Sequence, residues 1–251
     1  MHDDRNKLNP PSDHPTPPVN PVNSGYYPLG SAVFWIFSLY LPTILLSIGF
    51  AVYADINPNI IDPRVWFFDG DTTSLFTILM AFVTLPMLYL GSFREPYRQA
   101  FFALHKPFTV GEFRPYFLAT CLYIIASVVI HTLVNTPTPA FMVDILNTTD
   151  YIWLSFLAIC IVAPIFEELV FRGFIYAKLA STRLRHSGSI LVTAILFTFV
   201  HSQYSGLVLV DLFILAMLLS ITRYKTGNVY YCIAIHAINN MMSMLLLYTS
   251  N

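Results

Sequence analysis

The sequence predicts an all-α protein, a polytopic bundle of about seven transmembrane helices. Two observations lead to this fold class. Of the 251 residues, 56% are hydrophobic and only 11% are charged, whereas about 25% of the residues of a soluble domain are charged. Long apolar runs also recur along the chain, each close to the about 20 residues that cross a hydrocarbon core of roughly 30 Å as a helix. We therefore expect an integral membrane protein in contact with the lipid bilayer.

The predicted segments follow one another in a simple order. Residues 1–28 contain seven prolines and few apolar side chains, so we expect a disordered, Pro-rich tail that buries no core. Residues 29–149 are expected to supply three accessory transmembrane helices, and residues 150–251 four more. The predicted spans are 32–53, 74–93, 115–134, 152–171, 188–204, 206–222 and 229–248.

The distribution of basic residues gives an independent check on the number of spans. Twelve of the thirteen Lys and Arg residues fall in the tail or in the second, fourth and sixth connections. Because cytoplasmic loops are enriched in Lys and Arg, this predicts a cytoplasmic amino terminus and a carboxyl terminus outside. We expect the membrane to be a bacterial inner membrane. A net charge of −1 without a basic patch argues against nucleic acid as a partner.

The stretch PIFEELVFRGF places two adjacent glutamates at the end of an apolar run. A charged side chain at mid-bilayer costs roughly 2.5–3.5 kcal/mol, so it indicates a functional site. Glu168 and Arg172 are spaced i,i+4 in the favourable order and can pair on one helix face. Glu167 points about 100° away and is left without that partner, which suits a general base. The alternative is a structural ion pair with a spare carboxylate at the membrane interface.

Two further motifs place polar side chains inside apolar runs. In FTFVH, Phe197 and His201 share a helix face, and in HAINN, His236 and Asn240 do so. Taken alone, each could be a packing or interhelical hydrogen-bonding group. At 1.5 Å per residue, however, both histidines and Glu167 lie at depths around the middle of the bilayer. A carboxylate, two imidazoles and an amide at one depth predict an active site.

Two other polar residues have less certain roles. His131, in the third predicted span, is expected to be a hydrogen-bonded packing residue. Asp211 is the only aspartate clearly inside a predicted span. It is either a partner for a histidine or an interhelical hydrogen-bonding group. With no second aspartate beside it, an aspartyl-protease dyad is disfavoured.

The stretches FEELVFRG, FTFVH and TGNVYYCIAIHAINN resemble the EExxxR, FxxxH and HxxxN motifs of the CAAX protease and bacteriocin-processing (CPBP, or Abi) family of intramembrane proteases. All three occur in order within about residues 150–248. The resemblance implies a catalytic core at residues 150–251 that hydrolyses peptide bonds in the membrane. It implies that Glu167 activates a water with help from His201. It also implies that His236 and Asn240 donate to the oxyanion, and that Glu168 and Arg172 hold the helix and tune Glu167.

Several alternatives stay open at the level of the sequence. Glu167, His201 and His236 could hold Zn²⁺ with a water as the fourth ligand, and the family has been described both as metalloproteases and as metal-independent glutamate proteases. The substrate could be a prenylated CAAX protein, another lipidated peptide, a bacteriocin or leader peptide, or a membrane protein. A non-catalytic immunity or scaffold protein is an alternative function. A transporter is a weaker one, because no inverted repeat is visible.

Overall fold

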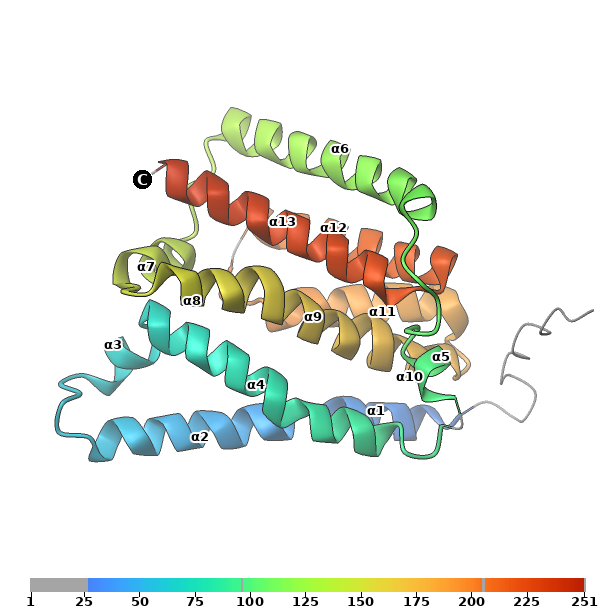
Figure 1. Ribbon diagram of the computed structural model, residues 1–251, viewed down its shortest axis with the longest axis horizontal. Coiled ribbons are helices and arrows are strands. Elements are labelled where there is room, and N and C mark those ends of the chain that lie inside the picture. Colours follow the sequence, from blue (N-terminus) through green and yellow to red (C-terminus); the bar gives the residue numbers. More distant parts are fainter. Residues whose placement is uncertain (1–26, 96, 205, 251) are drawn as a thin grey trace, which may run out of the picture.

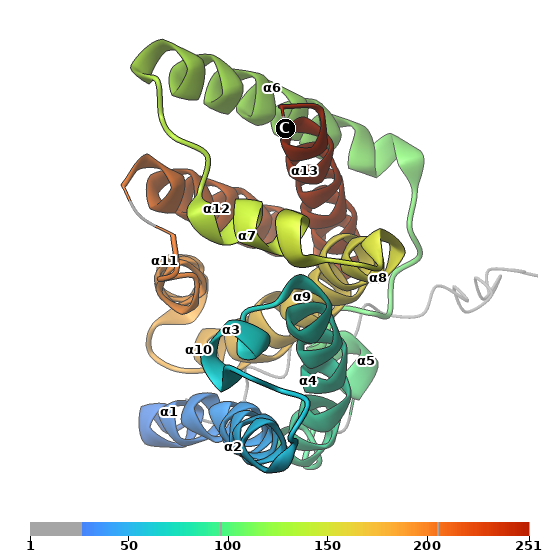
Figure 2. The same ribbon diagram turned by 90° about the vertical axis from the view of Figure 1, so that its left-hand side faces the viewer.

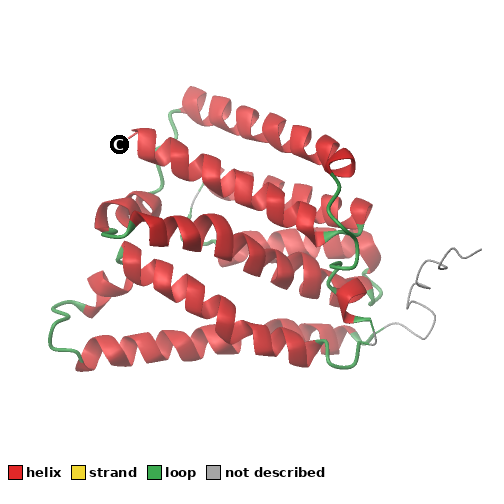
Figure 3. Cartoon of the chain, in the orientation of Figure 1, coloured by secondary structure: helices red, strands yellow, loops and turns green. Residues whose placement is uncertain are grey.

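The computed structural model describes residues 27–95, 97–204 and 206–250, and these residues form helices and connections without a strand (Figure 3). The predicted tail therefore lies almost wholly outside the described residues. Two views of the bundle are given in Figures 1 and 2. The helices before the fourth predicted span are α1 (Leu29–Ser38), α2 (Tyr40–Ile56), α3 (Pro63–Phe67), α4 (Gly70–Gly91), α5 (Arg98–Phe101), α6 (Val110–Val134) and α7 (Ala140–Thr148).

The fourth predicted span is one continuous helix over Ile152–Ala180. It consists of α8 (Ile152–Phe156), the π-helical segment η2 (Leu157–Val162), α9 (Ala163–Glu168), the π-helical segment η3 (Leu169–Ile175) and α10 (Tyr176–Ala180). Three helices follow: α11 (Arg185–Val200), α12 (Leu207–Thr226) and α13 (Val229–Ser250). The turn from α12 to α13 passes through Gly227, whose φ of 62° is left-handed and favours glycine.

Six helices in the described residues are long and apolar enough to cross a membrane. This confirms the all-α transmembrane fold and an integral membrane protein. The seventh predicted span is the exception, because α11 has only 16 residues and is about 24 Å long at 1.5 Å per residue. It ends at Val200, so the predicted span 188–204 was wrong at its end, and His201 lies in the turn after the helix. The start of α1 and the end of α13 lie at opposite ends of the bundle (Figure 1).

The first predicted span is broken near its start. The helix is interrupted at Leu39, between α1 and α2. Pro42 explains the break, because a proline has no N–H to donate to the carbonyl four residues earlier and its ring clashes with that group. The two pieces still form one apolar segment of 28 residues from Leu29 to Ile56.

The fourth span is the central element of the fold. In both views α9 lies between α4 on one side and α12 and α13 on the other (Figures 1 and 2). Its two π-helical segments lie on either side of α9, and η3 begins directly after Glu168. Pro164 follows η2 and cannot donate to the carbonyl of Cys160, which favours the wider turn there. Segments of this kind change which way side chains point, and they are frequent at functional sites.

One apolar core joins the accessory helices to the fourth span. Phe174 is fully buried and packs edge-on against Trp35 of α1 and Phe101 of α5. The same cluster extends to α4 and to α11. Its most buried members are Ala32, Ile36, Leu39, Leu88, Val170, Phe171, Phe174, Ile175, Leu179, Ala194, Phe197 and Ala216. The helix that carries the glutamates is therefore held on both sides by packing.

Candidate active site

Glu168 and Arg172 form a buried ion pair, as their spacing predicted. Arg172 Nη1 lies 2.9 Å from Glu168 Oε1, and both side chains are fully buried. Arg172 Nη2 also donates to the carbonyl of Ala216 on α12, at 3.1 Å. The guanidinium lies 4.6 Å above the centre of the Phe197 ring. The pair thus connects η3 to α11 and α12 as well as to its own helix.

Glu168 has a second partner that the sequence did not reveal. His236 Nδ1 lies 2.9 Å from Glu168 Oε1, and the His236 side chain is only 4% exposed. A carboxylate paired with Arg172 can only accept here, so His236 carries its proton on Nδ1. Glu168 therefore fixes the orientation and the tautomer of an imidazole on α13. A helix-holding role alone would not require this contact.

His201 is fixed in the same way by a different acceptor. Its Nδ1 lies 2.7 Å from the backbone carbonyl of Phe197, one turn earlier. The Phe197 ring is fully buried and contacts both imidazoles, with ring centres 4.6 Å from His201 and 5.6 Å from His236. Phe197 is therefore the common support of both histidines.

The third group at this place is Glu167. Its Oε2 lies 3.8 Å from His201 Nε2 and 3.9 Å from His236 Nε2. This oxygen is buried and has no hydrogen-bond partner within the described residues. Since both histidines carry their proton on Nδ1 when neutral, both Nε2 atoms present a lone pair. Glu167 Oε2 on α9 thus faces two further acceptors, His201 Nε2 from the turn after α11 and His236 Nε2 on α13, at distances too long for a direct hydrogen bond.

Asn240 lies one turn after His236 but is bound to the fourth span. Its Nδ2 donates to the carbonyl of Ile159 at 2.9 Å. That carbonyl belongs to the π-helical segment η2, where the wider turn alters the regular backbone bonding. This bond uses one of the two N–H groups of the Asn240 amide and leaves the second available. The structure thus places Asn240 at the fourth span beside the histidine motif, and it places the other six predicted residues in one cluster.

Comparison with known proteins bears on the same segment. Residues 149–242 match a family model described as type II CAAX prenyl endopeptidase, Rce1-like. The match is consistent with the CAAX protease family, whose motifs these residues resemble. The protease segment, as we call residues 149–242, contains all seven predicted site residues and overlaps the expected catalytic core.

One curated relative and the solved structures add little to this. An uncharacterized 24.3 kDa protein of Escherichia coli is 34% identical over 88 residues, which is 33% of this chain and 39% of that protein. The chain thus covers well under half of the relative's length. No solved structure matches the chain.

The donor types of the site are those of zinc proteases, but their spacing is not. Ligand atoms of a tetrahedral zinc ion, with bonds of 2.0–2.1 Å to His and to carboxylate oxygen, lie about 3.3–3.4 Å apart. Glu167 Oε2 lies 3.8 and 3.9 Å from the two Nε2 atoms. In the part of the chain that the structure describes, no group of three or more His, Cys, Asp or Glu side chains is arranged to hold a metal ion. The spacing of these three atoms therefore does not fit a zinc ion.

Tyr204 was missed by the sequence analysis. It lies in the turn between α11 and α12, where its ring stacks on His201 with the ring centres 6.4 Å apart and an interplanar angle of 13°. This position is outside the six candidate spans. Burial first, and then the charge of Glu167, raise the pKa of Tyr204 to about 12. The signal was present in the sequence as a tyrosine three residues after the motif histidine, but nothing local indicated where its ring points.

Asp211 lies away from the protease site. Its Oδ2 accepts from Ser127 of α6 and lies 2.8 Å from His131 Nε2, also on α6. The Tyr123 hydroxyl donates to the Asp211 backbone carbonyl at 3.1 Å. Asp211 is thus an interhelical hydrogen-bonding group, and the histidine that it contacts is His131 and not one of the two motif histidines. This cluster fastens α6 to α12 at the edge of the bundle (Figure 2).

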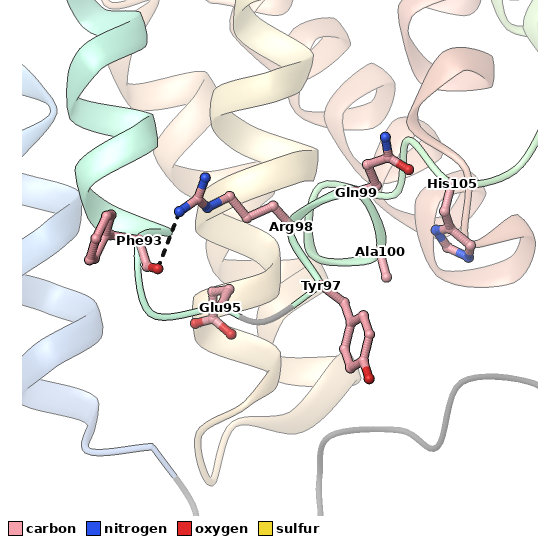
Figure 4. A pocket seen from close by; sticks show the side chains of 7 residues that line it. All are labelled: Phe93, Glu95, Tyr97, Arg98, Gln99, Ala100 and His105. Carbon is pink, nitrogen blue, oxygen red and sulfur yellow. Dashed lines mark hydrogen bonds between the residues drawn. The ribbon is translucent and has the colours of Figure 1, made fainter.

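A surface pocket of about 670 Å³ lies elsewhere, around the connection from α4 to α6. Figure 4 shows its lining side chains, with Arg98 donating to the carbonyl of Phe93. Glu95, at its rim, pairs with Lys178 of α10 at 2.9 Å. The lining residues are Phe93, Glu95, Tyr97, Arg98, Gln99, Ala100 and His105. It contains none of the motif residues, so we do not assign the chemistry to it.

Proposed function

We propose that this protein is an intramembrane endopeptidase that hydrolyses a peptide bond with a water activated by Glu167. The observation that supports this most is the buried Glu167 Oε2, which lacks a hydrogen-bond partner among the described residues and faces two imidazole nitrogens. Leaving a buried polar atom unsatisfied costs about 1–3 kcal/mol. A scaffold or immunity protein gains nothing from this arrangement, whereas a site that binds water does.

The chemistry follows from the lone pairs. A polar contact longer than about 3.5 Å is often bridged by water, and a water between these groups would donate one proton to Glu167 and the other to His201 Nε2. As the water oxygen bonds to the scissile carbonyl carbon, Glu167 takes its proton and the carbonyl π electrons move to the carbonyl oxygen. When the intermediate collapses, the C–N bond breaks and Glu167 returns the proton to the leaving amine.

His236 and Asn240 would stabilise the oxyanion. Asn240 has one N–H that is not used by the Ile159 carbonyl. His236 Nε2 can donate only when the imidazole is protonated, because Nδ1 already carries the proton held by Glu168. The Glu168 carboxylate holds the Nδ1 proton and so orients the imidazole, as the carboxylate of a catalytic triad does. Glu168 is thus a positioning residue, and Arg172 acts through it.

The proposed substrate is a peptide or membrane protein whose cleavage site enters the bilayer. The family match makes a prenylated peptide ending in a CAAX sequence the first substrate to test. Other lipidated peptides, leader peptides and bacteriocin precursors are the next. We further propose that the protein resides in a bacterial inner membrane with its amino terminus in the cytoplasm.

The experiment compares purified wild type with Glu167→Gln in liposomes, using a farnesylated CAAX peptide and its unmodified counterpart. Glutamine keeps the size of the side chain but cannot accept the proton, so cleavage should fall by about 10²–10⁴-fold. Glu112→Gln is the matched control, because Glu112 on α6 accepts from Tyr231 of α13 and is none of the seven candidate site residues, and glutamine can still accept. A folded Glu167→Gln protein that cleaves at the wild-type rate would refute the mechanism.

A further inference from the structure

We infer that Tyr204 is a further catalytic residue, whose hydroxyl donates a hydrogen bond to the oxyanion of the tetrahedral intermediate. This inference rests on the proposed function. It concerns a side chain from the turn between α11 and α12, which belongs to none of the three motifs. Four observations support it: the packing of the Tyr204 ring, its proximity to Glu167, the lack of neutral hydrogen-bond donors in the site, and the end of α11 at Val200.

The Tyr204 ring is held between two aromatic groups. On one side it stacks almost parallel to His201, with an interplanar angle of 13°. On the other, it meets Phe141 of α7 edge-on, with ring centres 6.0 Å apart and an angle of 85°. The backbone N–H of Tyr204 donates to the carbonyl of His201 at 3.0 Å. A ring fixed on both sides and tied to its neighbour's backbone presents its hydroxyl in a defined direction.

The phenol lies in the electrostatic field of the proposed base. After burial, the charge of Glu167 is the next cause that raises the pKa of Tyr204, to about 12. The hydroxyl therefore keeps its proton at neutral pH and is available as a donor. The Tyr204 ring also stacks on His201, whose Nε2 lies 3.8 Å from Glu167 Oε2, so the phenol lies beside the groups that would activate the water.

The site lacks neutral donors for an oxyanion. His201 and His236 use their Nδ1 protons on the Phe197 carbonyl and on Glu168, so their Nε2 atoms accept when neutral. Asn240 uses one of its two N–H groups on the Ile159 carbonyl. A phenol has a rotatable O–H, and within the described residues the Tyr204 hydroxyl makes no hydrogen bond of its own. It can therefore donate without breaking an existing contact.

Tyr204 reaches His201 from the turn that follows α11. In a continuous helix the two side chains would share a face at i,i+3, about one turn apart along the axis. Instead α11 ends at Val200, and the turn folds the tyrosine back over the imidazole. Gly206, at φ 55° and ψ −128°, then starts α12 in a conformation that side chains rarely adopt. The turn is thus shaped to bring this ring to the site.

The test is Tyr204→Phe in the full-length protein, in liposomes with the farnesylated CAAX peptide, beside the wild type and Glu167→Gln. Phenylalanine keeps both ring contacts and removes only the donor. Loss of one oxyanion donor lowers kcat by about 10²–10³-fold, and we expect this with KM unchanged. Tyr230→Phe on α13, where the ring is 39% exposed, is the matched control and should retain wild-type kcat.

Four outcomes separate the possibilities. A lower kcat, with an unchanged shape of the pH–rate profile from about pH 6 to about pH 9, supports the donor role. A shifted acidic limb with a nearly unchanged maximal kcat would mean that Tyr204 only tunes Glu167, and would overturn the inference. Wild-type kcat in a folded Tyr204→Phe protein would overturn it as well, while the Glu167 result keeps the proposed function. A wild type that cleaves neither peptide, nor a pool of membrane peptides, would overturn both.

Discussion

Arg172 offers a stability test whose size follows from its contacts. Replacing it by Met keeps a chain of similar length but removes the guanidinium. Glu168 then stays behind as a fully buried carboxylate, and its Oε2 already lacks a partner within the described residues. Breaking a buried pair in this way costs about 3–5 kcal/mol. The carbonyl of Ala216 also loses its donor, which costs about 1 kcal/mol more.

A double variant separates the stranded charge from lost packing. Glu168→Gln combined with Arg172→Met leaves no buried charge, and the glutamine oxygen can still accept from His236. Only hydrogen bonds of ordinary strength are then lost, worth about 1–3 kcal/mol. We therefore expect the double variant to be more stable than Arg172→Met alone, although it removes more polar groups.

Thermal unfolding in detergent measures the difference. For a chain of this size, 1 kcal/mol corresponds to roughly 2–4 °C, so Arg172→Met should lower the Tm by about 10 °C or more. The double variant should lose less than half of that. If the double variant unfolds at or below the temperature of Arg172→Met, the buried-charge reasoning is wrong. The buried-charge reasoning would also be wrong if Arg172→Met and the double variant were both purified in the same yield as the wild type.

Three other predictions follow from the fold and the site. Gly91→Ala should destabilise the protein by about 1–3 kcal/mol, because an added Cβ would clash with the ring of Phe174. Gly49→Ala is the control, since nothing lies within 4 Å of a Cβ there, and it should leave the stability unchanged or raise it. Equal melting temperatures for the two variants would contradict this. A chelator should leave peptide cleavage intact, because the spacing of the acceptors does not suit zinc; lost activity that zinc restores would show the opposite. A reporter after Asn251 should be accessible outside the cytoplasm and one in the 94–114 loop inside, and labelling both from one side would exclude the predicted topology.

The sequence by itself determined the membrane class and the approximate spans, and it named the candidate residues that the structure brings together. Composition and run length suffice for the spans, because a helix must be apolar for about 20 residues to cross the bilayer. The i,i+4 pairing of Glu168 and Arg172 was predictable because it lies within one helix turn. The gathering of Glu167 with both histidines was predictable from depth, since polar groups at mid-membrane need one another.

Only the tertiary structure showed which partners the glutamates and histidines of the site contact. The sequence after Val200 reads HSQYSG, but this polar stretch did not show where within it the helix stops, nor that His201 and Tyr204 both lie in the turn after α11. Nor could a local pattern show that Glu168 holds an imidazole from α13, because that contact depends on how three helices pack. The end of α11 and the contact between Glu168 and His236 were hidden from the sequence for the same physical reason. Hydropathy and periodicity report burial along one helix, whereas proton positions and the reach of a side chain depend on partners distant in the sequence and on where each helix stops.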